Sequence, residues 1–231
     1  MFLKTHTKLF KIVFSLNSMP LQKKDFIEIE FTGKTKEGEI FDSNITEDLK
    51  KTNFNIEAKP FIYALGEGMF LEGVDNFLII KEIGKYQIEL NPENAFGKRN
   101  PKFIQMVPIK VFHEQKMNPM PGHIFNFDGK IGKVITVSGG RVLIDFNNPL
   151  AGKDVVYELK ILRKIDKIEE KVKALNDFIF RKNFDFKIEN KKLTLEVDKG
   201  FKQFAELFKD RYKDLLDLEL EVNEKEGEKK D

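Results

Sequence analysis

Three short motifs in the first hundred residues carry the side chains that could do chemistry. Gly38-Glu39-Ile40-Phe41-Asp42-Ser43 places a carboxylate directly after an aromatic residue of an expected strand. Leu65-Gly66-Glu67-Gly68 is a glycine-bounded loop before an expected helix, and Asn94-Ala95-Phe96-Gly97 is a small-aromatic-glycine corner. Aromatic walls with one carboxylate can hold an apolar group and orient a polar one. Such a site would need no nucleophile, metal ion or cofactor.

Composition argues against several other kinds of site. The 231 residues include no cysteine, which excludes disulfides, thiol catalysis and thiolate metal sites. Three scattered histidines, His6, His113 and His123, cannot build an all-histidine metal site in one chain. The net charge of +2 gives no argument for a nucleic-acid partner, and no run approaches the ~18 apolar residues of a membrane span. We therefore expect no cofactor, no metal, no membrane and no specific nucleic acid.

Hydrophobic periodicity predicts the elements that must position these motifs. The expected strands are Phe26 to Phe31, Phe61 to Leu65, Ile83 to Leu90 and Lys153 to Arg163. Apolar residues at helical spacing predict a helix over Glu72 to Lys81, and Thr46 is expected to cap a single helical turn. Residues 25–97 and 147–163 would together form one discontinuous domain.

Residues 98–146 differ in character and predict a small β domain inserted into this host. Three strands are expected, at Ile124 to Phe127, Lys133 to Val137 and Arg141 to Phe146, with Gly139-Gly140 as a hairpin turn. Flexible methionines suit a surface that accepts many apolar sequences. The alternative is that the apolar residues simply fill the core of a small domain. The candidate surface residues are Phe103, Ile104, Met106, Val107, Met117 and Met120.

Residues 164–223 predict a separate α-β-β-α-β module. Asp166 and Glu169 form a capping-box-like pair before its first helix, and Gly200 to Tyr212 predicts its second. Leu216 to Val222 is expected as the last strand. At the ends, residues 1–24 are an extension, either a targeting segment or a mis-called start with Met19 favoured, and residues 224–231 are a charged tail.

Five motifs occur in an order and spacing that resembles the FKBP family of peptidyl-prolyl cis-trans isomerases: Thr32-Gly33, Phe41-Asp42, Pro60-Phe61, Leu65-Gly66-Glu67-Gly68 and Ala95-Phe96-Gly97. The resemblance covers about Asp25 to Gly97 and Asn147 to Leu162. It implies an α+β fold with an antiparallel sheet wrapped on a short helix. The catalytic residues it implies are Asp42, Phe41, Phe96, Phe31, Phe61 and Tyr157. The substrate-binding residues it implies are Phe70, Leu71, Val74 and Tyr63.

Such a site would act on the slow rotation about Xaa-Pro bonds. That rotation loses amide resonance and has a barrier of ~18–20 kcal/mol. The twisted amide has less charge separation than the planar one, so a poorly hydrated aromatic site favours it.

Three positions depart from the family pattern. Phe96 stands where members usually have Tyr, and Val74 stands where many have Trp. Phe31 also lacks a hydroxyl that could hold Asp42. We expect peptide turnover to survive these changes, with reduced affinity for the family's macrolide inhibitors.

The insert resembles the insert-in-flap domain of the SlyD-like branch, and the last module resembles the extra domain of its long archaeal type. The resemblance implies a cytoplasmic peptidyl-prolyl isomerase with chaperone activity, whose partners are unfolded or proline-containing polypeptides. The alternatives are a non-catalytic holdase and a ribosome-associated folding or assembly factor. Dimerisation, client binding and ribosome contact all stay open for the C-terminal module.

Overall fold

The computed structural model describes residues 19–52, 54 and 57–225. The chain divides into two compact units, one drawn from residues 1–33, 40–88 and 157–231 and the other from 34–39 and 89–156. Predictions for residues 1–18 and 226–231, in the extension and the charged tail, lie outside the described residues. The C-terminal module belongs to the same unit as the host sheet. The domain boundaries expected from the sequence stay predictions.

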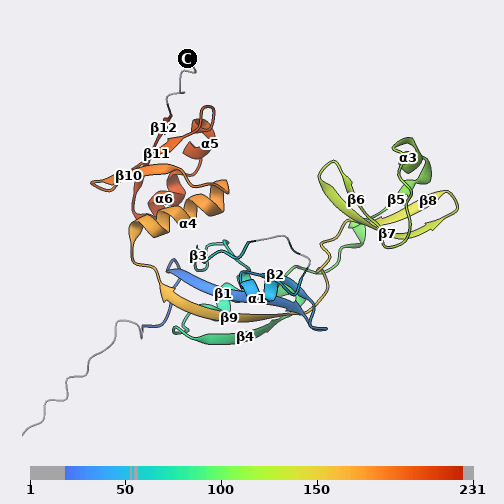
Figure 1. Ribbon diagram of the computed structural model, residues 1–231, viewed down its shortest axis with the longest axis horizontal. Helices are drawn as coiled ribbons and strands as arrows, with labels where there is room; N and C mark the ends of the chain where they lie inside the picture. The colour runs from blue at the N-terminus through green and yellow to red at the C-terminus, as the bar shows by residue number, and fades with distance from the viewer. Residues whose placement is uncertain (1–18, 53, 55–56, 226–231) are drawn as a thin grey trace, which may run out of the picture. The chain divides into compact units, whose positions relative to one another are not determined.

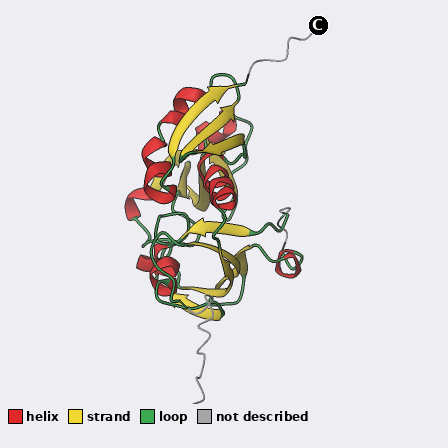
Figure 2. Cartoon of the chain, turned by 90° about the vertical axis from the view of Figure 1, so that its left-hand side faces the viewer, coloured by secondary structure: helices red, strands yellow, loops and turns green. Residues whose placement is uncertain are grey.

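A five-stranded sheet organises the first unit (Figure 1). Its strands are β1 (Phe26–Thr35), β2 (Ile40–Ser43), β3 (Phe61–Ala64), β4 (Lys85–Leu90) and β9 (Val155–Lys164). The order is β2-β1-β9-β4, and β3 pairs antiparallel with β1. Helix α2 (Glu72–Leu78) contributes the fully buried Val74 and Leu78 to the core. The expected mixed α+β fold is confirmed (Figure 2).

Two predictions about helix ends in this unit are wrong. Helix α1 (Thr46–Leu49) is preceded by Ile45 as its cap residue and has no side-chain cap, so Thr46 does not cap it. Helix α2 ends at Leu78 instead of Lys81. The reason is tertiary: Ile80 N–H donates to the carbonyl of Leu21 at 2.8 Å, and Leu21 N–H donates to that of Lys81 at 2.8 Å. These two hydrogen bonds direct the backbone that follows Leu78 away from the helical path.

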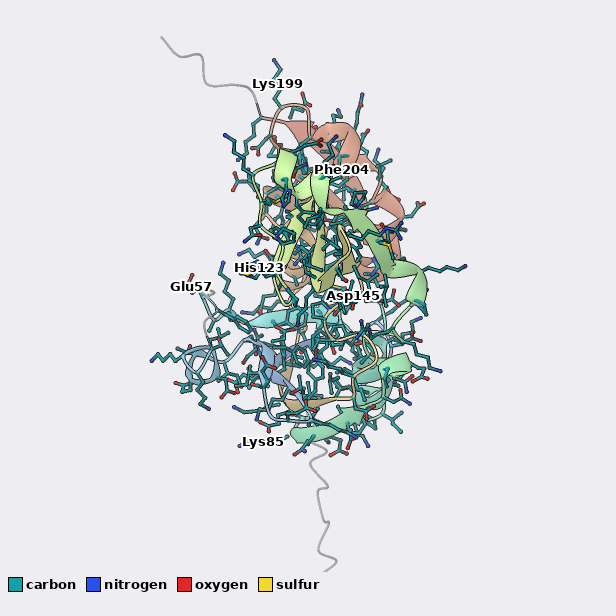
Figure 3. All side chains as sticks on the ribbon, turned by 90° about the vertical axis from the view of Figure 1, so that its right-hand side faces the viewer. Glu57, Lys85, His123, Asp145, Lys199 and Phe204 are labelled. Atoms are coloured by element: carbon teal, nitrogen blue, oxygen red, sulfur yellow. The ribbon has the colours of Figure 1, made fainter. Side chains whose placement is uncertain are left out.

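The second unit contains an antiparallel sheet in the order β5-β8-β7-β6. Its elements are η2 (Pro92–Asn94), η3 (Pro101–Phe103), β5 (Ile104–Pro108), α3 (Ile109–Glu114), β6 (Ile124–Phe127), β7 (Lys130–Ser138) and β8 (Arg141–Asp145). Phe112 of α3 is fully buried against Val134, Val142 and Ile144. Asp145, which is labelled in Figure 3 and lies at the end of β8, forms an ion pair with Arg99.

The hairpin at Gly139-Gly140 is confirmed, with both glycines at positive φ and Ser138 paired to Arg141. Sequence reasoning missed β5 and α3 because prolines crowd this stretch. Pro108 is tolerated because it ends β5, which is an edge strand, where a missing N–H costs little.

The C-terminal module has one more helix than expected. Its elements are α4 (Ile168–Phe180), β10 (Asp185–Glu189), β11 (Lys192–Val197), α5 (Lys202–Glu206), α6 (Lys209–Leu216) and β12 (Glu219–Glu224). The hairpin β10-β11 is antiparallel, and β12 lies parallel to β11. Phe204 of α5, which Figure 3 labels, is an exposed aromatic residue of this module.

Three local predictions in this module are wrong. Lys167 is the cap residue of α4 and makes no side-chain cap bond, so Asp166 and Glu169 do not form a capping box. The helix expected over residues 200–212 is two helices, which separate at Leu207 and Phe208. The last strand begins at Glu219, because α6 runs to Leu216 and the next residue is left-handed. No helix in the described residues is long and apolar enough to cross a bilayer.

Candidate active site

Six aromatic side chains from four strands and one loop meet in a single cluster of the first unit. They are Phe31, Phe41, Phe61, Tyr63, Phe70 and Tyr157, which we call the aromatic cluster. The Phe31 ring centroid lies 5.6 Å from that of Phe61 and 4.9 Å from that of Phe70. The Tyr157 centroid lies 5.7 Å from that of Phe41 and 5.6 Å from that of Phe70. The structure thus brings six of the predicted site residues together.

The sheet explains why these rings meet. Strands β2, β3 and β9 all pair with β1, so each presents its aromatic residues beside Phe31. Residues two apart share one face of a strand. Phe61 and Tyr63 therefore face the same side of β3, with ring centroids 5.1 Å apart.

A polar network fastens the end of β2 to β1 and so fixes the position of Asp42. Ser43 Oγ donates to the carbonyl of Phe31 at 3.0 Å and lies 3.0 Å from Thr32 Oγ1. The side-chain oxygen of Asn44 accepts from Phe31 N–H at 2.7 Å. Sequence reasoning quoted Thr32 and Ser43 within motifs without this role, and it missed Asn44. The signal at Ser43 and Asn44 was a pair of short polar side chains where β2 ends, a pattern that favours bonds to nearby backbone.

Asp42 brings a carboxylate to the edge of the aromatic cluster. Burial raises the pKa of this half-buried carboxyl, and a hydrogen bond from the Ser43 backbone partly opposes that rise. Burial also raises the pKa of the Tyr157 hydroxyl, and the Asp42 carboxylate raises it further. Asp42 is therefore close enough for its charge to act on the Tyr157 hydroxyl. A partly desolvated carboxylate interacts more strongly with a polar ligand than one in water does.

The glycine-bounded loop leads into the cluster from the end of β3. Gly66 and Gly68 have φ of 75° and 69°, a left-handed conformation that favours glycine. Leu71 then begins α2 as its cap residue, and its carbonyl accepts from Val74 and Asp75 at 3.0 Å each. The N–H groups at a helix start have no partner within the helix. The Leu71 N–H is therefore suited to the peptide-donor role that the sequence predicts for it.

Two other predicted site residues lie in different surroundings. Val74 is completely buried within α2 and belongs to the core beneath the loop. Phe96 is partly buried and belongs to the second unit, after η2. Its predicted catalytic role stays a prediction.

Comparison with known proteins decides the family. A family model described as FKBP-type peptidyl-prolyl cis-trans isomerase matches residues 18–113, and one described as FKBP26, IF domain matches residues 105–150. A probable FKBP-type 16 kDa peptidyl-prolyl cis-trans isomerase of Pseudomonas fluorescens is 33% identical over 107 residues, which are 45% of this chain and 71% of the relative. The chain belongs to the FKBP-type peptidyl-prolyl cis-trans isomerase family.

Two further relatives of this FKBP cover more of the chain. A short-type peptidyl-prolyl cis-trans isomerase of Methanocaldococcus jannaschii is 27% identical over 145 residues, which are 61% of this chain and 92% of the relative. The FKBP-type peptidyl-prolyl cis-trans isomerase SlyD of Helicobacter pylori is 26% identical over 124 residues, 52% of this chain and 67% of the relative. Family membership makes the protein a peptidyl-prolyl cis-trans isomerase, as the sequence motifs predicted.

The insert of this FKBP carries only part of the predicted binding surface on its outside. Phe103, Met106 and Met120 are about half exposed, at 51%, 58% and 48%. Val107 and Met117 instead pack against the insert core. Ile104 is partly buried. The core alternative raised from the sequence therefore applies to Val107 and Met117. A surface role is limited to the exposed candidates, Phe103, Met106 and Met120.

Sequence reasoning also missed a buried acid beside the aromatic cluster of this FKBP. Asp75 of α2 is 2% exposed, and burial raises its pKa to about 6, with the Tyr63 hydroxyl and the Gly66 backbone partly opposing the rise. Among the described residues, neither the Tyr63 hydroxyl nor Asp75 Oδ1 makes a well-aligned hydrogen bond. Even so, the Asp75 charge contributes to raising the pKa of Tyr63, after burial itself. No sequence pattern marked Asp75. The apolar spacing predicted the helix and the side of it that packs into the core, but it did not indicate that an acid would be buried there.

The raised pKa of Asp75 predicts a measurable pH dependence of stability. Between about pH 4 and pH 6 the folded protein binds a proton that the unfolded chain has lost, so the free energy of unfolding falls as pH rises through this window. Relative to Asp75→Asn, the wild type should lose roughly 1 kcal/mol of stability between pH 5 and pH 7. Urea denaturation of both proteins at pH 5, 6 and 7 measures this difference. A difference that stays constant with pH would contradict the assignment.

Proposed function

We propose that this isomerase acts in the cytoplasm on unfolded client proteins, which its inserted domain binds while the aromatic cluster isomerises their Xaa-Pro bonds. The proposal joins two surfaces of different character. One is the aromatic cluster with the Asp42 carboxylate, and the other is an exposed apolar face of the insert. The observation that carries the proposal is that apolar face, because the isomerase site alone does not require it.

At the aromatic cluster, the proline ring would pack on the partly exposed rings of Phe41, Phe61 and Phe70. Phe31 and Tyr157 are buried, with 6% and 1% of their surface exposed, and pack against these rings from the core. These rings replace water around the prolyl amide, which favours the twisted geometry over the planar one. The Leu71 N–H would donate to a substrate carbonyl. The Asp42 carboxylate would accept from a substrate N–H and hold the peptide in one orientation. No covalent bond forms or breaks, so these residues bind and orient while the amide rotates.

The insert sheet buries one face and exposes the other. Val134, Val142 and Ile144 point into the core, so by strand alternation their neighbours point outwards. The apolar residues on the outward side include Met106 of β5, Ile124 of β6 and Ile131 of β7, with exposed fractions of 58%, 63% and 62%. We call these three residues the apolar sheet face.

Exposed apolar surface supports the proposal, because apolar patches on proteins commonly mark the places where other chains bind. The three side chains come from three different strands of one sheet, so an extended client segment could contact all of them. Ile124 and Ile131 were missed from the sequence. Their signal was their place in two strands whose inward side is already supplied by other residues, Phe125 and Phe127 in β6 and Val134 in β7.

Binding at the insert raises the concentration of client near the aromatic cluster. A flexible connection of short length gives an effective concentration on the order of millimolar. The gain applies to clients long enough to reach both surfaces. Turnover of a tetrapeptide should therefore not depend on the insert, whereas refolding of a protein should.

Substitution of the apolar sheet face tests this proposal. The triple variant Met106→Ser, Ile124→Ser and Ile131→Ser should slow catalysed, proline-limited refolding by about tenfold, since tethering is lost. Its kcat/KM on a proline tetrapeptide should stay within about twofold of the wild type. Both rates can be measured with the full chain, because the three side chains are exposed and outside the insert core.

A matched control replaces three exposed polar residues of the same insert: Lys102→Ser, Gln105→Ser and Lys110→Ser. This control should refold proteins at the wild-type rate. If the apolar triple variant also retains the wild-type refolding rate, the insert does not bind clients through this face and the proposal fails.

A further inference from the structure

Arg211 in the C-terminal module contacts the glycine-bounded loop of the isomerase site. Its guanidinium donates to the backbone carbonyl of Glu67, and Nη1 lies 3.5 Å from Glu67 Oε2. Lys23 Nζ lies 3.6 Å from the other carboxylate oxygen. The Glu67 side chain is only 10% exposed and that of Arg211 is 32% exposed. The two residues are 144 positions apart in the chain, so the contact joins two separate parts of the fold.

The loop that Arg211 contacts is only a few residues away in the chain from a member of the aromatic cluster. Glu67 stands between Gly66 and Gly68, both left-handed, and glycines give the backbone more freedom than any other residue. Three residues after Glu67 comes Phe70, which belongs to the aromatic cluster, and then Leu71 with its N–H at the start of α2. A hydrogen bond to the Glu67 carbonyl therefore limits motion in the segment that presents both groups.

The helix that carries Arg211 is itself held firmly. The buried Tyr212 hydroxyl donates to Asn176 of α4, which ties α6 to α4. Helix α4 in turn borders a groove of about 350 Å³ whose lining includes Phe61. A second ion pair, between Asp214 and Lys24, joins α6 to the start of the host sheet. Arg211 thus contacts the loop from a helix that is itself held in place by contacts with α4 and Lys24.

We propose that Arg211 is a positioning residue for prolyl isomerisation, through which the C-terminal module holds the Glu67 loop in the conformation that presents Phe70 and the Leu71 N–H. The inference rests on the assignment of the aromatic cluster as the prolyl site. It gives the C-terminal module a role in catalysis that does not depend on a partner. An arginine suits this role because its planar fork reaches a carbonyl and a carboxylate at once, which a lysine ammonium does not.

The test compares tetrapeptide isomerisation and amide hydrogen exchange in full-length variants. Arg211→Ala should lower kcat/KM by about three- to tenfold, because the loop must then be ordered when substrate binds. Exchange of the amides at 66–71 should become faster. Arg211→Lys should recover part of the activity. Glu67→Gln should cost only about twofold, because it keeps the backbone carbonyl that Arg211 binds.

Lys209→Ala is the matched control, since it removes an ion pair of the same helix, to Glu206, and leaves the loop contact in place. It should leave kcat/KM and the exchange at 66–71 unchanged. The inference is overturned if Arg211→Ala keeps wild-type kcat/KM and exchange, or if Lys209→Ala changes both as much. An error in the site assignment would give a different result, namely wild-type activity both in Asp42→Ala and in a folded Gly33→Ala protein, in which rings of the aromatic cluster must move.

Discussion

Replacing Asp42 with alanine is expected to lower kcat/KM for a proline tetrapeptide by about 10- to 100-fold. The carboxylate is half-buried at the edge of the aromatic cluster, where burial raises its pKa. A hydrogen bond to a charged group in such surroundings contributes about 1.5–3 kcal/mol, and each ~1.4 kcal/mol corresponds to a factor of ten in rate. Asp42→Asn should lose less, because the amide oxygen can still accept a hydrogen bond from the substrate.

A protease-free isomerisation assay measures this effect without cleaving the substrate. Glu47→Ala, at an exposed position of α1, is a suitable control and should behave as the wild type does. Equal and near-zero rates in the wild type and Asp42→Ala would favour a non-catalytic holdase. Equal and high rates would show that the aromatic rings act without the carboxylate.

Replacing Gly33 with alanine is expected to damage both the stability and the activity of the protein. An added Cβ would lie 2.8 Å from Cε2 and Cζ of Phe41 and 3.0 Å from Cε1 of Tyr157. Real Cβ atoms do not approach so closely, so both rings of the aromatic cluster must move. Overpacking of this kind costs about 1–3 kcal/mol of unfolding free energy. Displaced rings should also lower kcat/KM by about tenfold or more.

Urea denaturation and the tetrapeptide assay on Gly33→Ala measure the two effects. Gly84→Ala is the matched control in the same unit, because its nearest atoms, in Tyr86, lie at ordinary contact distances of 3.5–3.7 Å. That variant should differ from the wild type by less than about 0.5 kcal/mol. Wild-type activity in a folded Gly33→Ala protein would mean that the positions of Phe41 and Tyr157 do not matter for turnover.

Much of the site followed from local sequence. The alternation in β3 places Phe61 and Tyr63 on one face, because side chains in a strand repeat every two residues. The glycines at 66 and 68 mark a loop because they adopt a left-handed backbone that other residues avoid. The hairpin at Gly139-Gly140 was predictable for the same reason.

Other features depended on contacts between distant segments. Helix α2 ends early because Leu21 binds the backbone of Ile80 and Lys81. Asp75 titrates near pH 6 because the surrounding fold buries it. Strand β5 forms at the edge of a sheet, although the prolines around it left this stretch without a strand prediction.

The sequence by itself determined the family and the mixed fold, since these depend on short motifs and on regular spacing of residue types. Through the resemblance to that family it also indicated all six members of the aromatic cluster. Only the tertiary structure decided which apolar residues of the insert are exposed and that Arg211 reaches Glu67. Periodicity says which residues of one element share a face. It does not say which elements dock together, because docking depends on the packing of whole surfaces that are far apart in the chain.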